Sequence, residues 1–122
     1  MTRKQFVEEV LEKRIKSMRD VLDKKNSEYA DSDDVFKAFA LSTSLSFHKT
    51  SQAVAWEFMV KHLQSIQSII SDYEKKKTLP DEFKLEEKIG DAINYLILIE
   101  GMFKEAMEPA KLEQARIKYT LI

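Results

Sequence analysis

The sequence contains no cysteine, and its 122 residues include only two glycines and two prolines. Without cysteine, disulfide bonds and zinc sites with thiolate ligands are excluded, and the composition is typical of a reducing cytoplasm. An all-β protein needs glycine, proline and similar residues at its tight turns, so their scarcity argues against hairpin-rich folds. Helices are the secondary structure that remains.

Long apolar runs and a strong charge of one sign are also missing. The richest apolar stretch, 92–99, is far shorter than the roughly 20 residues that cross a bilayer. The first residues, MTRKQFVEEVLEKR, hold charges where a signal peptide has an apolar segment. Lysine and arginine total 20 against 21 aspartates and glutamates, for a formal net charge of -1. We therefore expect a cytoplasmic protein that binds neither a membrane nor duplex nucleic acid.

Hydrophobic residues make up 43% of the chain, charged residues 34% and aromatic residues 10%. A chain with this much apolar material can offset the entropy lost on ordering, so it should fold. Its length suits one domain and is too short for two independent cores. We expect a single helical domain over residues 1–122.

Apolar residues recur at intervals of three and four along most of the chain, which is the period of amphipathic helices. Thr2 and Gln5 form a capping-box pair at the start of the first helix. Pro80 and Pro109 bound the most apolar helix, because proline cannot sit inside a helix without losing a bond. The predicted helices are 2–28, a short one within 35–41, 50–77, 81–108 and a short terminal one, 110–119. The predicted fold is all-α, a compact bundle of four main helices with a short C-terminal helix.

The predicted helix 81–108 is apolar nearly all round, since between Ala92 and Ile99 the polar groups are Asn94 and the hydroxyl of Tyr95. Such a helix is buried on several sides. A chain of this length offers few neighbours to cover it, so the helix is either the central element or is partly covered by a second subunit. We expect a homo-oligomer.

Three acids, Asp31, Asp33 and Asp34, lie together between the first two predicted helices. Paired carboxylates there could hold a hard cation such as Mg²⁺, and the structural alternative is that they cap the next helix. An EF-hand loop counted from Asp31 is excluded, because Phe36 and Ser42 occupy the positions that require glycine and glutamate. Capping and cation binding both stay open.

Polar residues follow one face of the predicted helix 50–77, namely Glu57, Lys61 and Gln64, with His62 on the neighbouring stripe. Lys61 and His62 are candidates for contacts with a phosphate. In the structural alternative, Glu57 and Lys61 form an ordinary exposed ion pair, and His62 is a core histidine with a satisfied partner.

Three oxygen-bearing side chains, Glu87, Asp91 and Asn94, share one face of the most apolar helix, which costs free energy unless they are paired. In the structural interpretation, Asn94 bonds across the bundle and Asp91 pairs with a base such as Lys61. In the functional interpretation, which we favour, Glu87 and Asp91 face a cleft and bind a metal-phosphate group or a base edge. Gly90 costs about 1 kcal/mol relative to alanine in a helix, so it predicts close approach of another backbone or a ligand beside Asp91.

An acidic-aromatic box, a Lys-His pair and an Asp-x-x-Asn-Tyr box lie between Lys24 and Leu98. They comprise residues 28–29, 31–36, 39, 56–58, 61–63 and 89–95. In combination these motifs resemble the phage family called nucleotide modification associated domain 1. The resemblance implies a phage or prophage origin and a role in nucleotide metabolism, with Tyr29 of the acidic-aromatic box as a further nucleotide-binding residue.

The segment 87–91 is also similar to the second metal-binding helix of MazG-like all-helical nucleotide pyrophosphohydrolases. Those enzymes hold magnesium with an E-x-x-E helix followed by an E-x-x-D helix. Here Lys88 stands three residues before Asp91, and Val60 stands three residues after Glu57. The resemblance implies a related fold without the full carboxylate set, and it leaves open whether the chain is an enzyme. A pyrophosphohydrolase-like or nucleotide-modifying activity is the enzymatic option.

The leading hypothesis is a phage-encoded protein that binds a nucleotide or modified nucleotide in a cleft between helices 50–77 and 81–108. The predicted magnesium ligands are Asp33, Asp34, Glu87 and Asp91. The predicted nucleotide contacts are Tyr29, Lys61, His62, Asn94 and Tyr95. No catalytic residue is assigned. The alternative hypothesis is a non-enzymatic phage protein in the host cytoplasm that blocks a host defence protein or a polymerase, or sequesters a nucleotide.

Overall fold

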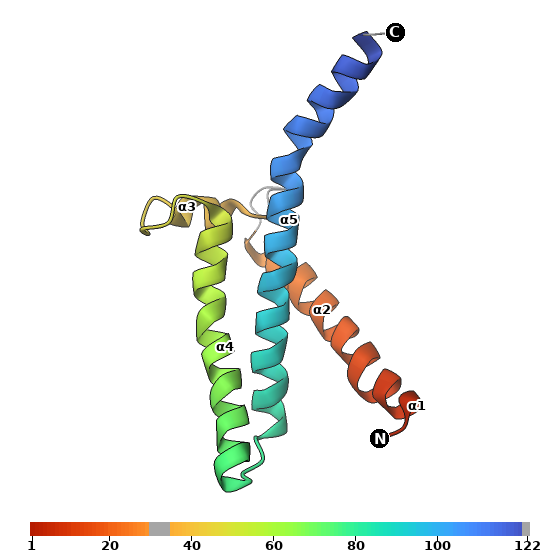
Figure 1. Ribbon diagram of the computed structural model, residues 1–122, viewed down its shortest axis with the longest axis vertical. Helices are drawn as coiled ribbons and strands as arrows, with labels where there is room; N and C mark the ends of the chain where they lie inside the picture. Colours follow the sequence, from red (N-terminus) through yellow and green to blue (C-terminus); the bar gives the residue numbers. More distant parts are fainter. Residues whose placement is uncertain (30–34, 121–122) are drawn as a thin grey trace.

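The computed structural model describes residues 1–29 and 35–120 of the chain (Figure 1). The regular elements among them are α1 Arg3–Phe6, the π-helical turn η1 Val7–Leu11, α2 Glu12–Tyr29, α3 Lys37–Ser42, α4 Ser51–Lys76 and α5 Glu82–Thr120. Each of these elements is helical, so the predicted all-α fold is confirmed. Because α1, η1 and α2 follow one another without a break, we refer to residues 3–29 as the N-terminal arm.

The start of the N-terminal arm confirms the predicted capping box. The hydroxyl of Thr2 accepts a hydrogen bond from the backbone N–H of Gln5 at 3.1 Å, and the side chain of Gln5 accepts one from the backbone N–H of Thr2 at 2.8 Å. These two bonds satisfy N–H groups that a helix start leaves without partners. The helix therefore begins where the sequence predicts it.

Helices α4 and α5 form an antiparallel hairpin, the two long rods that lie side by side in Figure 1. The Thr50 hydroxyl caps α4 by accepting from the N–H of Ala53, and Lys77 ends the helix in the left-handed conformation at φ 56. After the turn, a carboxylate oxygen of Asp81 accepts from the N–H of Lys84 at 3.0 Å and starts α5. The predicted boundary around Pro80 is therefore confirmed.

The most deeply buried residues of the described chain all belong to this hairpin. They are Val54, Ala55 and Met59 of α4 and Ala92 and Met102 of α5, each at most 5% exposed. Ala92 opens the nearly all-apolar stretch of the sequence, and its burial against α4 makes α5 the central element of the fold.

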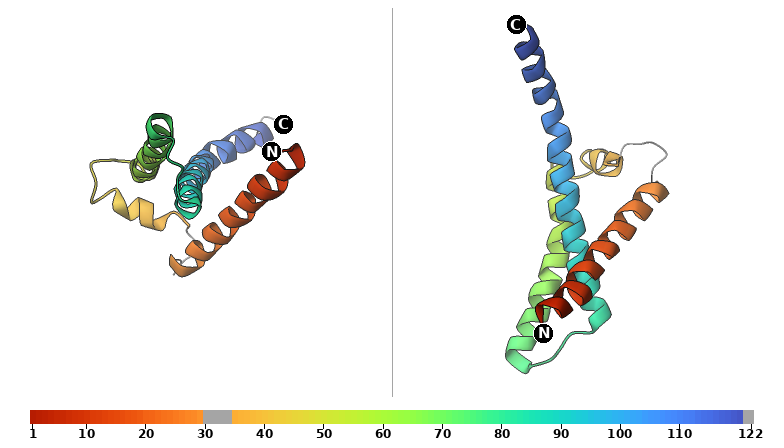
Figure 2. Two further views of the ribbon diagram at one scale, coloured as in Figure 1. Left: turned by 90° about the horizontal axis from the view of Figure 1, so that it is seen from below. Right: turned by 90° about the vertical axis from the view of Figure 1, so that its right-hand side faces the viewer.

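The remaining elements cover different parts of the hairpin. Helix α3 packs on α4 through the rings of Phe39 and Phe58, whose centroids are 6.3 Å apart. The N-terminal arm crosses α5, where Arg14 lies against Gly90. Figure 2 shows α3 and the N-terminal arm at separate places around the α4–α5 pair. None of the helices in the described ranges has both the length and the apolar character needed to cross a bilayer.

The predicted end of the long helix at Pro109 is wrong, because α5 continues through Pro109 to Thr120. The separate terminal helix 110–119 is therefore the last part of α5. Proline removes one backbone bond and crowds the preceding turn, which bends a helix when the sequence beyond it favours helix. Residues 110–118, AKLEQARIK, are mostly strong helix formers. In Figure 1 the axis of α5 changes direction toward this end, which projects beyond the hairpin.

Candidate functional site

Asp91 of α5 and His62 of α4 meet at the contact between the two helices. Nδ1 of His62 lies 3.4 Å from Oδ2 of Asp91, and both side chains are mostly buried. The atoms are not aligned as a hydrogen bond, and Nδ1 of His62 is buried without a hydrogen-bond partner among the described residues. Of the two predicted bases, His62 and not Lys61 approaches Asp91.

The ring of Tyr95 stacks on the imidazole of His62. The two ring centroids are 5.6 Å apart with an angle of 28° between the ring planes, and Phe58 meets Tyr95 edge-on at 6.5 Å. Burial raises the pKa of the Tyr95 hydroxyl above its ordinary value, and the negative charge of Asp91 raises this pKa further. Tyr95 therefore stays protonated at neutral pH and can donate a hydrogen bond.

Asn94 lies on the same stretch of α5, and its amide oxygen is buried. This Oδ1 atom has no hydrogen-bond partner in the described part of the chain. A buried carbonyl oxygen without a partner costs about 1–3 kcal/mol, so such an atom calls for an explanation. The sequence-based alternative in which Asn94 bonds across the bundle is not what the described residues show. We refer to Glu87, Asp91, Asn94 and His62 as the polar cluster.

A groove of about 640 Å³ runs between the N-terminal arm and the first half of α5. Glu87, Asp91 and Asn94 lie along the α5 side of this groove. Its other lining is mostly apolar, with Phe6, Val10, Met18, Phe83, Ile89 and Ile93 among the contributors. The sequence predicts a cleft between α4 and α5, but core side chains such as Met59 and Ala92 fill the space there. The α5 members of the polar cluster, Glu87, Asp91 and Asn94, therefore face a hollow on the side of the N-terminal arm.

Arg14 is the cation that the structure adds to this region. Its Nη2 donates to the backbone oxygen of Glu86 at 3.1 Å, and its Nη1 would lie 2.5 Å from a Cβ at position 90. Gly90 thus makes room for a guanidinium group, which corrects the prediction of a backbone or ligand at that point. Beside Arg14, Lys13 pairs with Glu86 at 2.9 Å, and this hydrogen bond raises the pKa of Lys13.

Sequence reasoning did not identify Arg14, because it is one of many charged residues on an amphipathic helix. The signal that could have led to it is Gly90, which indicates close approach without naming the neighbour.

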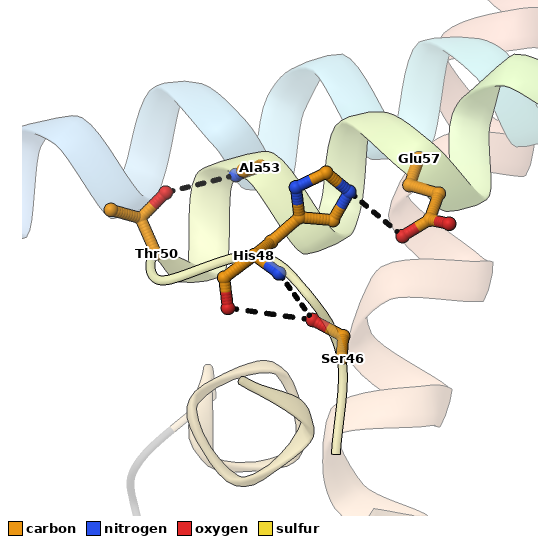
Figure 3. A network of polar contacts seen from close by, with 5 residues as sticks. All are labelled: Ser46, His48, Thr50, Ala53 and Glu57. Atoms are coloured by element: carbon orange, nitrogen blue, oxygen red, sulfur yellow. Dashed lines mark hydrogen bonds and ion pairs between the residues drawn. The ribbon is translucent and has the colours of Figure 1, made fainter. Parts of the chain in front are cut away.

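Glu57 is engaged by a loop residue. Its Oε2 lies 3.0 Å from Nε2 of His48, in the segment that leads into α4 (Figure 3). The same segment is held by Ser46, whose hydroxyl accepts from the N–H of His48 at 3.0 Å. Lys61 is exposed and, unlike Asp91 and Asn94, is not part of the groove lining. The sequence-based alternative predicted an ion pair between Glu57 and Lys61, whereas in the structure Glu57 contacts His48.

The predicted metal ligands are only partly placed. Glu87 is half-exposed and pairs with Lys88 at 3.7 Å, one turn of helix away from Asp91. Asp33, Asp34 and the side chain of Tyr29 lie outside the described residues. Among the side chains that the structure does describe, no group of three or more histidines or acids could hold a metal ion. Glu87 and Asp91 alone fit the one or two carboxylates that magnesium usually takes from a protein when substrate phosphates supply further ligands.

No protein-family model, curated protein or solved structure matches this chain. The resemblance to the phage nucleotide-modification family and to MazG-like enzymes therefore stays a prediction.

Proposed function

We propose that this protein binds a nucleotide in the groove between the N-terminal arm and α5, and that it serves nucleotide metabolism in a phage, as the sequence resemblance implies. The observation that carries the proposal is that two polar side chains, Asp91 and Asn94, line one wall of a 640 Å³ groove whose lining is otherwise mostly apolar. Ligand pockets have volumes of about 300–1,000 Å³, with apolar walls and a few polar groups that fix orientation. The groove has both properties.

Each part of a nucleotide finds a chemical counterpart around the groove. The apolar wall formed by residues such as Val10, Met18 and Ile93 suits the face of a base. The amide side chain of Asn94, which lines the groove, suits the donor and acceptor groups of a base edge. Arg14 supplies a planar set of donors that matches phosphate oxygens. Glu87 and Asp91 would hold magnesium, which neutralises phosphate charge when it is bound.

His62 and Tyr95 support the ligand groups rather than replace them. His62 lies behind Asp91, and the Tyr95 ring lies against His62. This stack limits the orientations open to the carboxylate of Asp91, which is how a second layer of residues keeps a binding group in place. Lys61 is exposed on α4 outside the groove lining, so we assign it no contact with a ligand in the groove.

Titration calorimetry with a panel of nucleoside triphosphates and magnesium tests the proposal. We expect Asp91→Asn and Arg14→Ala to lower affinity about tenfold or more, because each removes a charged partner of the ligand. Lys61→Ala should leave the affinity unchanged, because Lys61 does not line the groove. The matched controls are Asp72→Asn and Lys75→Ala, which change exposed residues of α4 that do not line the groove. Unchanged affinity in Asp91→Asn and Arg14→Ala, with helicity intact by circular dichroism, would remove the idea.

Assays for released phosphate or pyrophosphate on the same panel decide between an enzyme and a binding protein. Release that Asp91→Asn abolishes would make the chain a hydrolase. Binding without release would make it a nucleotide-sequestering protein.

A second candidate function, surface binding to a host protein, is favoured by the loop before α4. Leu45 and Phe47 are almost fully exposed there, at 93% and 105%. Exposed apolar side chains that lie together on the surface are typical of protein interaction sites. If no nucleotide binds, the expected finding is a protein complex that Leu45→Ser and Phe47→Ser disrupt while Asp91→Asn leaves it intact.

A further inference from the structure

Both helices of the hairpin carry a line of apolar residues spaced alternately three and four positions apart. On α4 the line is Trp56, Met59, Leu63, Ile66, Ile70 and Tyr73. On α5 it is Leu85, Ile89, Ala92, Leu96, Ile99 and Phe103. This alternation is the seven-residue repeat by which helices pack in coiled coils and four-helix bundles. Each helix therefore carries one apolar line suited to bundle packing.

A single chain covers only part of these two lines. Met59 is 1% exposed, but Trp56, Leu63 and Ile70 of α4 are 53%, 38% and 55% exposed. On α5, Leu96 and Phe103 are 52% and 49% exposed. We call these exposed residues the seam face; they are Trp56, Leu63, Ile70, Leu96 and Phe103.

The other described elements contact different sides of the two helices. Phe58 and His62 of α4, which contact α3 and Tyr95, lie on a different stripe from Leu63. On α5, Asn94 lines the groove under the N-terminal arm, and Leu96, two residues later, points to the opposite side of the helix. Figure 2 agrees, since α3 and the N-terminal arm leave one side of the hairpin bare.

On α4, charge is absent from the middle of the seam face. The residues that border it on α4 are Val60 and Gln67, whereas the charged Glu57 and Lys61 lie on the far side of the helix. On α5, Glu100 lies four residues after Leu96, at the border of the seam face, and pairs with Lys104 at 3.4 Å. An apolar centre with charged groups at its border is typical of subunit contacts.

The accessible area indicates how much surface lacks cover. The chain exposes 10040 Å², whereas a compact monomer of 14.3 kDa exposes about 6,800 Å². The excess is about 3,200 Å². A permanent homodimer buries about 1,000–2,500 Å² on each subunit, so one partner copy would cover roughly a third to three quarters of this excess.

We propose that the seam face binds the seam face of a second copy of this chain, so that two α4–α5 hairpins form a four-helix bundle. A self-complementary patch of this kind closes under two-fold symmetry, and each seam residue then occurs twice in the interface. The groove and the polar cluster remain on the outer sides of the bundle.

Light scattering coupled to size exclusion measures the mass of the full chain. We expect twice the 14.3 kDa of one chain for the wild type. Leu63→Glu and Leu96→Glu should each weaken the dimer at least about a hundredfold, because each places two charges in an apolar contact. Leu45→Glu is the matched control, since Leu45 is 93% exposed on a loop away from the seam face. A wild-type monomer, or a dimer that Leu45→Glu breaks and Leu96→Glu does not, would overturn the proposal.

Trp56 offers a second measurement that needs no variant. It is the only tryptophan of the chain and belongs to the seam face. Dilution of the wild type should shift its fluorescence emission to longer wavelength, in step with the fall in mass, as the indole becomes exposed. If mass falls on dilution while the emission stays constant, the interface lies elsewhere and the proposal fails.

The dimer and the nucleotide site are tested independently. Asp91→Asn should leave the mass of the wild type unchanged, because Asp91 does not belong to the seam face. Loss of nucleotide binding in Asp91→Asn therefore says nothing against the dimer, and a monomeric wild type says nothing against the groove.

Discussion

The polar cluster and the seam face lie on the same two helices and differ in what they lack. The polar cluster holds buried atoms of His62 and Asn94 without hydrogen-bond partners in the described chain. The seam face consists of apolar side chains, such as Leu63 and Leu96, that need no hydrogen-bond partner but are exposed to solvent. An unpaired acceptor needs a hydrogen-bond donor in a specific position. Exposed apolar area is stabilised by burial against any apolar surface of complementary shape. The first deficit points to a small molecule and the second to another helix pair.

The largest predicted loss of stability follows from a substitution in the core between α4 and α5. Met59 is 1% exposed between α4 and α5, so Met59→Ala leaves a cavity and should cost about 2–5 kcal/mol of unfolding free energy. Urea unfolding followed by circular dichroism measures it. Leu45→Ala, at 93% exposure, should stay within about 0.5 kcal/mol of the wild type. Equal effects at the two positions would mean that the hairpin is not the core.

The melting temperature should depend on protein concentration, and this dependence should come from the contact between the two seam faces. If two copies fold together, each tenfold rise in concentration adds about 1.4 kcal/mol to the stability of the dimer, and the melting temperature rises with it. Melting curves over a range of concentrations check this, with Leu96→Glu as the comparison. A melting temperature that does not depend on concentration would contradict the contrast drawn between the two regions.

Replacement of Asn94 should separate stability from binding. Asn94→Leu removes the unpaired amide oxygen and keeps a similar volume, so we expect about 1 kcal/mol of added stability together with loss of nucleotide affinity. Gln64→Leu, which changes an exposed amide on α4, is the control. Denaturant curves and calorimetry measure the two outcomes. A destabilised Asn94→Leu variant would show that the amide has a structural partner after all.

The smallest expected effect concerns alkaline pH. Because the pKa of Tyr95 is raised above 10.0 in the fold, the stability it contributes is complete below pH 10 and is lost as the pH rises through the folded value. Tyr95→Phe removes this titration, so stability should fall less steeply at high pH than in the wild type. Thermal unfolding across the alkaline range tests this against Tyr73→Phe, whose ring is half-exposed. Parallel curves for the wild type and Tyr95→Phe would contradict the burial of the hydroxyl.

Local signals in the sequence were sufficient for most of the fold. Thr2 with Gln5, Thr50 and Asp81 cap helices where the sequence places them, because a cap depends on residues within one turn. The prediction that the long helix ends at Pro109 was wrong, because it considered the proline without the helix-forming residues that follow it. Helix boundaries that depend on neighbouring residues can be predicted from sequence. A proline can either bend a helix or end it, and the sequence alone does not tell which of the two occurs.

The candidate site was predictable only in part. The shared face of Glu87, Asp91 and Asn94 follows from helical spacing, and all of them do line one groove. The partners did not follow, because His62 with Asp91, Arg14 with Gly90 and His48 with Glu57 join residues on separate elements. Spacing along one helix says which side chains share a face and nothing about what stands opposite.

The sequence by itself determined that this chain is helical, where most helices start and stop, and that α4 and α5 carry repeating apolar lines. Only the tertiary structure decided which residues of those lines are covered, that the hollow lies under the N-terminal arm, and that His62 rather than Lys61 meets Asp91. The physical reason is the distance along the chain over which each interaction acts. Backbone hydrogen bonds and caps act within a few residues, whereas packing and burial depend on the directions in which whole helices cross.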